Sequence, residues 1–204
     1  MSKHFFKRRA GLTLFTVAMS FGLIGSVQSA PETRFAVLAG GCFWCTEADF
    51  EALPGVIEAE SGYAGGKKPN PTYEEVSRGD SGHIEVVKVT YDPKKVSYEA
   101  LLKHYWRTVD PTVSNQQFCD RGPHYRTAIF YADAEQLATA EKSKAELIKS
   151  GAVPRVYTEI LMLNAFYPAE EYHQDYYKKN PLRYKYYRNG CGRDARLKEI
   201  WKTQ

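Results

Sequence analysis

Cysteine is scarce in this chain of 204 residues, and four cysteines are too few for a disulfide scaffold. No second C-x-x-C and no H-x-x-x-H segment accompanies the pair formed by Cys42 and Cys45, which disfavours a zinc site with four protein ligands. The sequence also lacks internal repeats, low-complexity tracts and long linkers. We therefore expect one folded domain and interpret each cysteine by its own position.

The start of the chain has the layout of a secretory signal peptide. An apolar run over residues 10–27 is followed by small and polar residues, and cleavage is expected after Ser29. A retained membrane anchor is the alternative, because the run reaches the lower edge of a spanning length, and a twin-arginine route is also open. The basic residues before the run are Lys3, Lys7, Arg8 and Arg9.

The sequence thus predicts a signal peptide over residues 1–29 and an exported protein, periplasmic or secreted, made of residues 30–204. Removal of the signal takes four basic and no acidic residues, which leaves equal numbers of each. A neutral protein gives no argument for a nucleic-acid partner, nor for a membrane partner unless the signal is retained. We expect a monomer.

Hydrophobic periodicity predicts the order β-α-β-β-α-β-α-β and an α+β fold, a ferredoxin-like sandwich with helices on one face of a mixed sheet. The second strand alternates so that Ile57, Ala59 and Tyr63 share a face. The last helix is expected between Asp133 as N-cap and Gly151 as C-cap. Strands are predicted at 34–39, 56–63, 83–91, 127–131 and 157–163, and helices at 42–53, 97–109 and 133–151.

The catalytic core is expected to occupy about residues 34–177. From Lys178 the periodicity is lost, and residues 178–204 are predicted to form a long, irregular C-terminal tail. Ordered irregular segments of this length are uncommon, which suggests a function.

The stretch LAGGCFWCTEADFE places Cys42 after a strand and two glycines, at the start of a helix. Unpaired backbone N–H groups and the positive end of the helix dipole would then favour the Cys42 thiolate. A pair of buried structural cysteines is the alternative, and the glycine approach argues against it by exposing both thiols.

Glu85 alternates with Val87, Val89 and Tyr91, which places its carboxyl on the apolar face of a strand. Desolvation there would raise the pKa of Glu85 and keep it protonated. A glutamate on an edge strand that leans into solvent is the alternative.

Two further segments place polar side chains beside turns, where functional residues gather more often than in cores. Tyr73 follows a proline turn, and Asp120 and Tyr125 flank a glycine-proline loop in FCDRGPHYR. Taken singly, each tyrosine is as well explained by a packed surface aromatic, because the chain has 15 of them.

Six ordered motifs together resemble one family, the type A peptide methionine sulfoxide reductases. The motifs are G-C-F-W, G-Y-A-G-G, N-P-T-Y, G-H-x-E, D-R-G-x-x-Y-R and E-E-Y-H-Q. The resemblance runs from about Phe35 to Arg196 and so covers nearly all of the chain after the predicted signal.

The resemblance implies reduction of the S epimer of methionine sulfoxide, free or within proteins. Cys42 would attack the sulfoxide sulfur and Glu85 would act as the acid. The methyl group would lie against aromatic side chains and the oxygen would accept hydrogen bonds. The residues implied in binding are Phe43, Trp44, Tyr73, Tyr125 and, through water, Asp120.

The product of the first step would be methionine and a sulfenic acid on Cys42, which condenses with a second thiol. The resemblance implies Cys191 in the tail for that role, and Cys45 is the alternative resolving residue. Cys119 is either a bystander or paired with another cysteine. The resemblance implies neither cofactor nor metal, and a thioredoxin-like protein as external reductant.

Two other classes compete with this reading. A thiol–disulfide oxidoreductase is favoured only by C-F-W-C at a helix start, and the tryptophan between the cysteines is atypical of it. A binding module would use the basic, aromatic stretch YKKNPLRYKYYR as its surface, but the neutral charge after signal removal weakens it.

Overall fold

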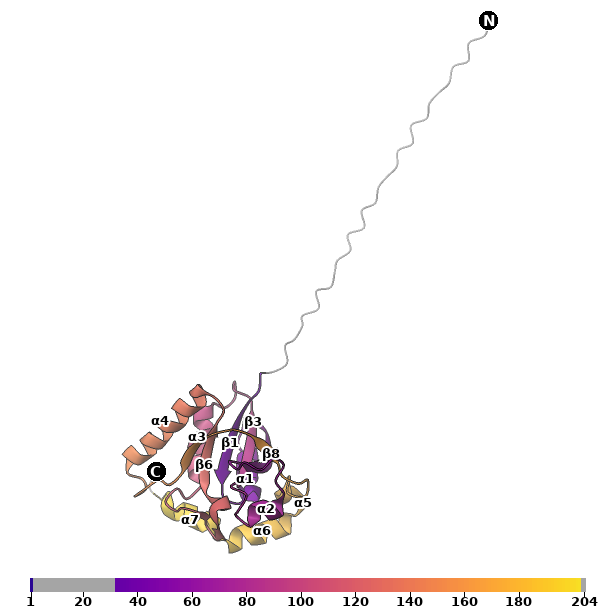
Figure 1. Ribbon diagram of the computed structural model, residues 1–204. Helices are drawn as coiled ribbons and strands as arrows, with labels where there is room; N and C mark the ends of the chain where they lie inside the picture. The colour runs from indigo at the N-terminus through magenta and orange to yellow at the C-terminus, as the bar shows by residue number, and fades with distance from the viewer. Residues whose placement is uncertain (2–31, 203–204) are drawn as a thin grey trace. The chain divides into compact units, whose positions relative to one another are not determined.

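The computed structural model describes Met1 and residues 32–202 (Figure 1). Apart from Met1, the predicted signal peptide lies outside the described residues. Within 32–202 no helix has both the length and the apolar character that crossing a bilayer requires. The strands are β1 (Arg34–Gly40), β2 (Val56–Ala64), β3 (Ile84–Tyr91), β4 (Gln116–Gln117), β5 (Asp120–Arg121), β6 (Thr127–Tyr131), β7 (Glu159–Met162) and β8 (Phe166–Pro168). The helices are α1 (Phe43–Glu51), α2 (Tyr73–Ser77), α3 (Tyr98–Thr108), α4 (Ala134–Ser150), α5 (Tyr176–Lys179), α6 (Pro181–Gly190) and α7 (Arg193–Ile200), with a 3-10 turn, η1 (Pro123–Tyr125).

The larger sheet has six strands in the order β7-β6-β1-β3-β2-β8. Strands β6 and β7 pair in parallel, whereas the other neighbours are antiparallel. The predicted α+β class with a mixed sheet is confirmed. Because β1 and β3 lie in the middle, most of their residues are buried on both faces, and runs such as Ala36–Ala39 and Val86–Val87 are apolar.

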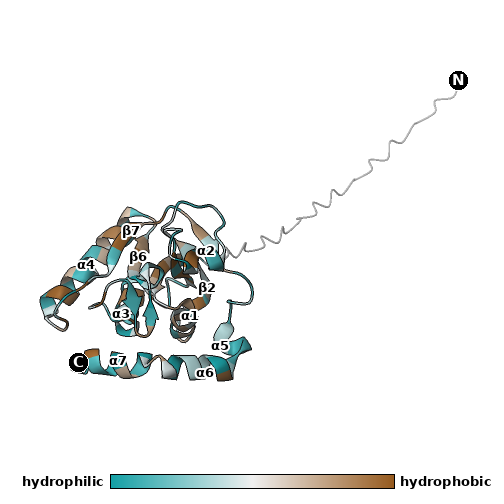
Figure 2. Ribbon diagram, turned by 60° about the horizontal axis from the view of Figure 1, so that its bottom comes forward, coloured by the Kyte–Doolittle hydropathy of each residue, from teal (hydrophilic) through white to brown (hydrophobic). Residues whose placement is uncertain are grey.

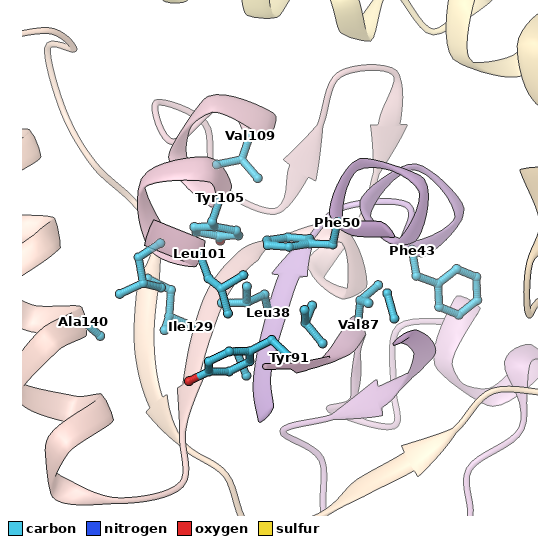
Figure 3. Packing of buried hydrophobic residues seen from close by; sticks show 14 of the residues in the cluster. Leu38, Phe43, Phe50, Val87, Tyr91, Leu101, Tyr105, Val109, Ile129 and Ala140 are labelled. Atoms are coloured by element: carbon cyan, nitrogen blue, oxygen red, sulfur yellow. The ribbon is translucent and has the colours of Figure 1, made fainter. Parts of the chain in front are cut away.

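The main core fills the space between this sheet and the helices α1, α3 and α4. Figure 3 shows Phe50 of α1 and Tyr105 of α3 packed with Leu38 of β1. A smaller cluster on the other face contains strand and loop residues and no residue of these helices. The prediction that helices pack on one face of the sheet therefore agrees with the structure.

The capping and turn residues in the sequence predicted most boundaries of the helices and strands correctly. The Asp133 carboxylate accepts a hydrogen bond from the Gln136 N–H, and Gly151 ends α4 in the left-handed conformation. The prediction that Ile57, Ala59 and Tyr63 lie on one face of β2 is wrong for Ile57. The register shifts between Val56 and Glu58, so Ile57 is 58% exposed, while Ala59 and Tyr63 are buried.

The predicted irregular tail is wrong, because residues 176–200 are mostly helical. Pro181 is the first residue of α6, where a proline's fixed φ suits a helix, and Gly192 at φ 68° separates α6 from α7. Figure 2 shows α6 and α7 in line along one side of the described body. No residue of α6 is buried, so this helix carries no apolar periodicity for a sequence to reveal.

Charged groups hold this tail on the core. The buried Arg193 guanidinium donates to the Gly40 carbonyl at 3.2 Å and to the Thr108 carbonyl at 2.8 Å. Asp49 of α1 lies 2.8 Å from Arg188 and 3.6 Å from Arg193. These contacts fix the segment that contains Cys191 on both of its sides.

We expect Arg193→Met to lower the free energy of unfolding, because methionine fills a similar volume but cannot donate to the Gly40 and Thr108 carbonyls. Each such buried group costs about 1–3 kcal/mol. Urea denaturation measures the change. The matched control is Arg183→Met, at an exposed position of α6, which should stay within about 0.5 kcal/mol of the parent. Equal effects of the two substitutions would contradict an anchoring role for Arg193.

Candidate functional site

Cys42 lies at the junction between β1 and α1 and is the N-cap of the helix, as predicted. The chain reaches it through Gly40 and Gly41. Gly41 adopts φ +81°, and a Cβ there would collide with the Gln117 side chain. Glycine is therefore required by both conformation and space, and this tight approach brings the Cys42 sulfur to the end of the central strand.

Both cysteines of α1 are buried, which contradicts the predicted exposure. Cys42 is 5% exposed and Cys45 is 2% exposed. Burial raises the pKa of the Cys42 thiol well above its ordinary value, and the neighbouring Cys45 adds to the shift. Burial therefore opposes the thiolate that the helix N-terminus was predicted to favour.

Glu85 lies beside Cys42 and is 2% exposed, so the alternative of a glutamate leaning into solvent is wrong. Its Oε2 accepts the N–H of Phe43, the first residue of α1, at 2.9 Å. Burial raises the pKa of Glu85 to about 8, although the bond from Phe43 opposes the shift. At neutral pH the carboxyl carries a proton, as the sequence predicted.

Tyr73 and Tyr125 contribute two phenol groups to the site that contains Cys42 and Glu85. Tyr73 is the first residue of α2, where a Thr72–Glu75 capping box fixes the helix start and the Tyr73 N–H donates to Glu170 at 2.8 Å. Burial raises the pKa of Tyr73 to about 12 and also raises the pKa of Tyr125. Both phenols stay protonated and remain hydrogen-bond donors.

Phe43 and Trp44 provide an aromatic wall. The Trp44 ring stacks on Tyr176 at 3.7 Å between centroids, and its indole N–H donates to His173 Nδ1 at 3.0 Å. Burial lowers the pKa of His173, which leaves its ring neutral and able to accept this bond. Trp44 is thus held by groups that lie far along the chain.

Asp120 enters the site from β5, and Tyr187 enters it from α6. The Tyr187 hydroxyl donates to Asp120 Oδ2 at 2.6 Å. Sequence reasoning missed Tyr187, because it is one tyrosine among many in a segment with no periodicity. Its position four residues before Cys191 is the only signal that could have indicated it.

These side chains enclose a cavity of about 90 Å³. All the residues predicted to attack, protonate or bind substrate line it, together with Tyr187. Cys45 and Cys191 do not. The lining residues are Cys42, Phe43, Trp44, Tyr73, Glu85, Asp120, Tyr125 and Tyr187.

Cys191 forms a disulfide with Cys119, 72 residues away in sequence, while Cys42 and Cys45 are free thiols. The open question about Cys119 is thereby answered in this state: it is paired. Cys191, the predicted partner of Cys42, ends α6 next to the cavity wall formed by Asp120 and Tyr187.

Two groups of described residues have the composition of a metal site, but each is occupied by other interactions. In the first, Cys119 and Cys191 are joined in the disulfide beside Asp120. In the second, Glu47 accepts from Ser61 and from the Asp175 N–H, and Glu51 pairs with Lys178.

The cavity therefore combines a buried sulfur nucleophile with a neutral acid and two phenol donors, next to apolar rings. Donors that converge in a dry site stabilise negative charge as it develops on an oxygen. The aromatic wall suits an apolar group on the same molecule. The arrangement fits a small, polarised oxygen compound with an apolar substituent, attacked at an atom next to its oxygen.

Comparison with known proteins gives consistent results. The family model for peptide methionine sulfoxide reductase matches residues 34–204. The chain is 52% identical to peptide methionine sulfoxide reductase MsrA 2 of Caulobacter vibrioides, over 93% of this chain and 97% of the relative. Its structure is similar to that of reduced Mxr1 from Saccharomyces cerevisiae, with a TM-score of 0.70 and 34% identity over 74% of this chain and 87% of that one. Mxr1 in complex with Trx2 matches with a TM-score of 0.52 and 25% identity, over 74% and 90% of the two chains.

The raised pKa of Glu85 predicts a pH-dependent stability. Between its ordinary pKa of 4.5 and about 8, the folded state holds a proton that the unfolded state has lost. The free energy of unfolding should therefore fall as pH rises through this window, by up to about 1.4 kcal/mol per pH unit. Denaturation of Glu85→Gln across pH 5–8 should lack this part of the slope, whereas the exposed control Glu171→Gln should keep it. Equal slopes in both variants would show that Glu85 ionises normally.

Proposed function

Since the chain belongs to the peptide methionine sulfoxide reductase family, we propose that Cys42 is its nucleophile and Glu85 its acid. The protein is an oxidoreductase that reduces methionine sulfoxide to methionine, and a thioredoxin-type protein is its external reductant, as in the complex of Mxr1 with Trx2. The cavity supports this assignment of residues to steps.

In the first step one oxygen atom moves from the methionine sulfur to the Cys42 sulfur. The sulfoxide S–O bond breaks and an S–O bond forms on Cys42, so that the oxygen, with one proton, becomes the hydroxyl of a sulfenic acid. The thiol proton of Cys42 ends on the Glu85 carboxylate and replaces the proton that Glu85 gives to the oxygen. The sulfoxide is reduced by two electrons and the thiol is oxidised by two. Glu85 protonates the oxygen as charge develops on it, while Tyr73 and Tyr125 donate hydrogen bonds to it.

The observation that carries this proposal is the meeting of a protonated carboxyl with a buried thiol in one small cavity. Its volume of about 90 Å³ equals that of about three water molecules. That is the space needed by a sulfur, its oxygen and its methyl group. Phe43 and Trp44 then contact the methyl group, and Asp120 helps to order the polar part of the substrate through water.

The same cavity supports a preference for the S epimer, whether the methionine sulfoxide is free or within a protein. The sulfoxide sulfur carries an oxygen, a methyl group and a chain. The donors select the oxygen, the aromatic wall selects the methyl group, and the chain must leave through the opening. Because the oxygen, the methyl group and the chain each have their own position around the sulfur, only one of the two epimers can place all three correctly.

Removal of the sulfenic acid is the second part of the proposal. Cys191 resolves it by forming a disulfide with Cys42, and Cys45 is the alternative resolving residue. The position of Cys191 beside Asp120 and Tyr187 of the cavity wall supports Cys191. Cys45, one helical turn inside Cys42, is not part of the lining.

The sequence of residues 1–29 supports export, with repair of oxidised proteins outside the cytoplasm as the task. Mass spectrometry of the protein recovered from each cell fraction tests this. A mature terminus after Ser29 in the periplasm or medium is the expected result, and a full-length chain confined to the cytoplasm would contradict it.

The reaction itself is tested by NMR of free methionine sulfoxide with dithiothreitol as reductant. The parent should consume one epimer and leave the other. Cys42→Ser should consume neither, because a hydroxyl is a far weaker nucleophile at neutral pH, and its circular dichroism spectrum should match the parent. Retained activity in a folded Cys42→Ser variant would contradict the assignment of the nucleophile.

Glu85→Gln should slow the first step by about 10²- to 10⁴-fold, the usual loss on removing a positioned acid. Single-turnover formation of methionine measures the rate. The matched control is Glu47→Gln, a buried glutamate within α1 that accepts hydrogen bonds from Ser61 and the Asp175 N–H and does not line the cavity. A rate within a few-fold of the parent in Glu85→Gln would assign this carboxyl a structural role.

Cys191→Ser should leave the first step intact, since no atom of Cys191 lines the cavity. About one methionine should form per enzyme, and turnover with thioredoxin should then fall sharply, because a protein reductant reaches a recessed sulfenic acid poorly. A small thiol should restore part of the turnover. Full thioredoxin-dependent turnover, together with a Cys42–Cys45 disulfide, would identify Cys45 as the resolving residue.

A further inference from the structure

We propose that Glu170 is a positioning residue for the first step of the reaction, and that its carboxylate holds the Tyr73 phenol in place in the cavity. The inference rests on the proposed function, in which Tyr73 donates to the sulfoxide oxygen. Glu170 does not line the cavity, so it acts through Tyr73 and not on the substrate.

Tyr73 needs such a support because of where it lies. It is the first residue of α2, a helix of five residues of which only Val76 is buried, and the loop that leads to it from β2 is mostly exposed. A donor must lie within hydrogen-bond reach of the oxygen on which charge develops, and a displacement of about 1 Å can cost about 10²-fold in rate. A short helix after an exposed loop does not by itself hold a phenol to that accuracy.

The two oxygens of the Glu170 carboxylate connect this helix with the sheet. Its Oε1 accepts the Tyr73 N–H at 2.8 Å, and its Oε2 accepts the Tyr63 hydroxyl at 2.8 Å. Tyr63 is fully buried in β2, where it pairs with Glu85 of β3. One carboxylate therefore joins the backbone of the donor to a residue beside the acid, and it helps to fix the distance between the two groups that act on the oxygen.

Both of these bonds are donated to Glu170, which suits an ionised carboxylate, because it has acceptor positions on both oxygens and no donor. Although burial opposes ionisation, the Tyr73 N–H and the Tyr63 hydroxyl hold the pKa of Glu170 below its ordinary value. Glu170 and Glu85 therefore have different charge states at neutral pH. An ionised carboxylate holds the donor, and a neutral carboxyl gives the proton.

A general anchor for the segment after β8 is the competing explanation. That segment is already held on β2 on either side of Glu170. The Ala169 N–H donates to the Ser61 carbonyl at 2.9 Å, and the Gln174 side chain bonds both the N–H and the carbonyl of Ser61 at 2.9 Å. The segment thus has a fixed place without the Glu170 carboxylate, which leaves the start of α2 as the part that this carboxylate positions.

The test is a double-mutant cycle on the rate of the first step. Glu170→Gln keeps the volume but leaves one acceptor oxygen for two donors, because an amide NH₂ cannot accept. In the otherwise unchanged protein it should slow formation of methionine by about 10- to 10²-fold. In a Tyr73→Phe background it should change the rate by less than about twofold, because the phenol that it positions is absent. An anchor with no link to Tyr73 would slow both proteins by the same factor.

Single-turnover quench experiments on the reduced, full-length protein with free methionine sulfoxide measure these rates. The loss in Glu170→Gln should appear in the rate at saturating substrate rather than in the concentration that gives half of it, since the donor acts mainly in the transition state. The matched control is Glu171→Gln, the neighbouring glutamate, whose side chain is 88% exposed and pairs with Lys179. It should keep the parent's rate.

Tyr63→Phe is the second variant, and it decides the question if circular dichroism shows that Glu170→Gln does not fold. It removes one partner of the carboxylate and keeps the bond to the Tyr73 N–H. Its loss of rate should therefore be smaller than that of Glu170→Gln, and it should also fall below about twofold in the Tyr73→Phe background.

The possible failures are distinguishable. The parent's rate in Glu170→Gln, or equal losses in the two backgrounds, would overturn the positioning role and leave Cys42 and Glu85 as assigned. The parent's rate in Tyr73→Phe would overturn the donor role of Tyr73 together with this inference. No methionine from the parent would overturn the proposed function itself.

Discussion

The hydrogen bond from the Phe43 N–H to Glu85 is the contact on which the site depends, because it joins the start of α1 to the third strand. The sheet register places both ends of this bond. Leu38 pairs with Val87, and Tyr63 pairs with Glu85 itself. A slip of one residue in β3 would turn the carboxyl to the opposite face of the sheet. The strength of the acid and the position of the nucleophile therefore follow from the same strand pairing.

Features with a local cause could be predicted from the sequence. Glu85, Val87 and Val89 alternate along β3, so the pleat of the strand places all three on the same buried face. Burial on that face raises the pKa of Glu85. Asp133 and Gly151 bound α4 because a capping carboxylate and a left-handed residue are properties of single positions. The cavity residues other than Tyr187 were found through short local motifs, several of which stand where an element begins, as Phe43 begins α1 and Tyr73 begins α2.

Features set by tertiary contacts could not be predicted in the same way. The helix start favours the Cys42 thiolate, but the packing around it decides the pKa, and that packing includes Tyr187 from a helix 145 positions later in the printed sequence. The tail was expected to be irregular because α6 buries no residue. Its order comes from Arg193 and Arg188, whose partners are backbone carbonyls and a carboxylate of the core. The Cys119–Cys191 pairing spans 72 residues and leaves no periodic trace.

The wall behind Trp44 also has a consequence for the order of events during synthesis. His173, Tyr176 and Tyr187 all follow Phe166–Pro168, the last strand of the sheet. When all strands of the sheet have been synthesised, His173, Tyr176 and Tyr187 have not. The side chains that hold Trp44 and complete the cavity around Cys42 are therefore still missing. The nucleophile is among the first folded residues to be made, and its chamber is among the last. Chemistry at Cys42 is thus coupled to completion of the chain, so a truncated product that retains the sheet carries the thiol without the enclosure that makes it selective.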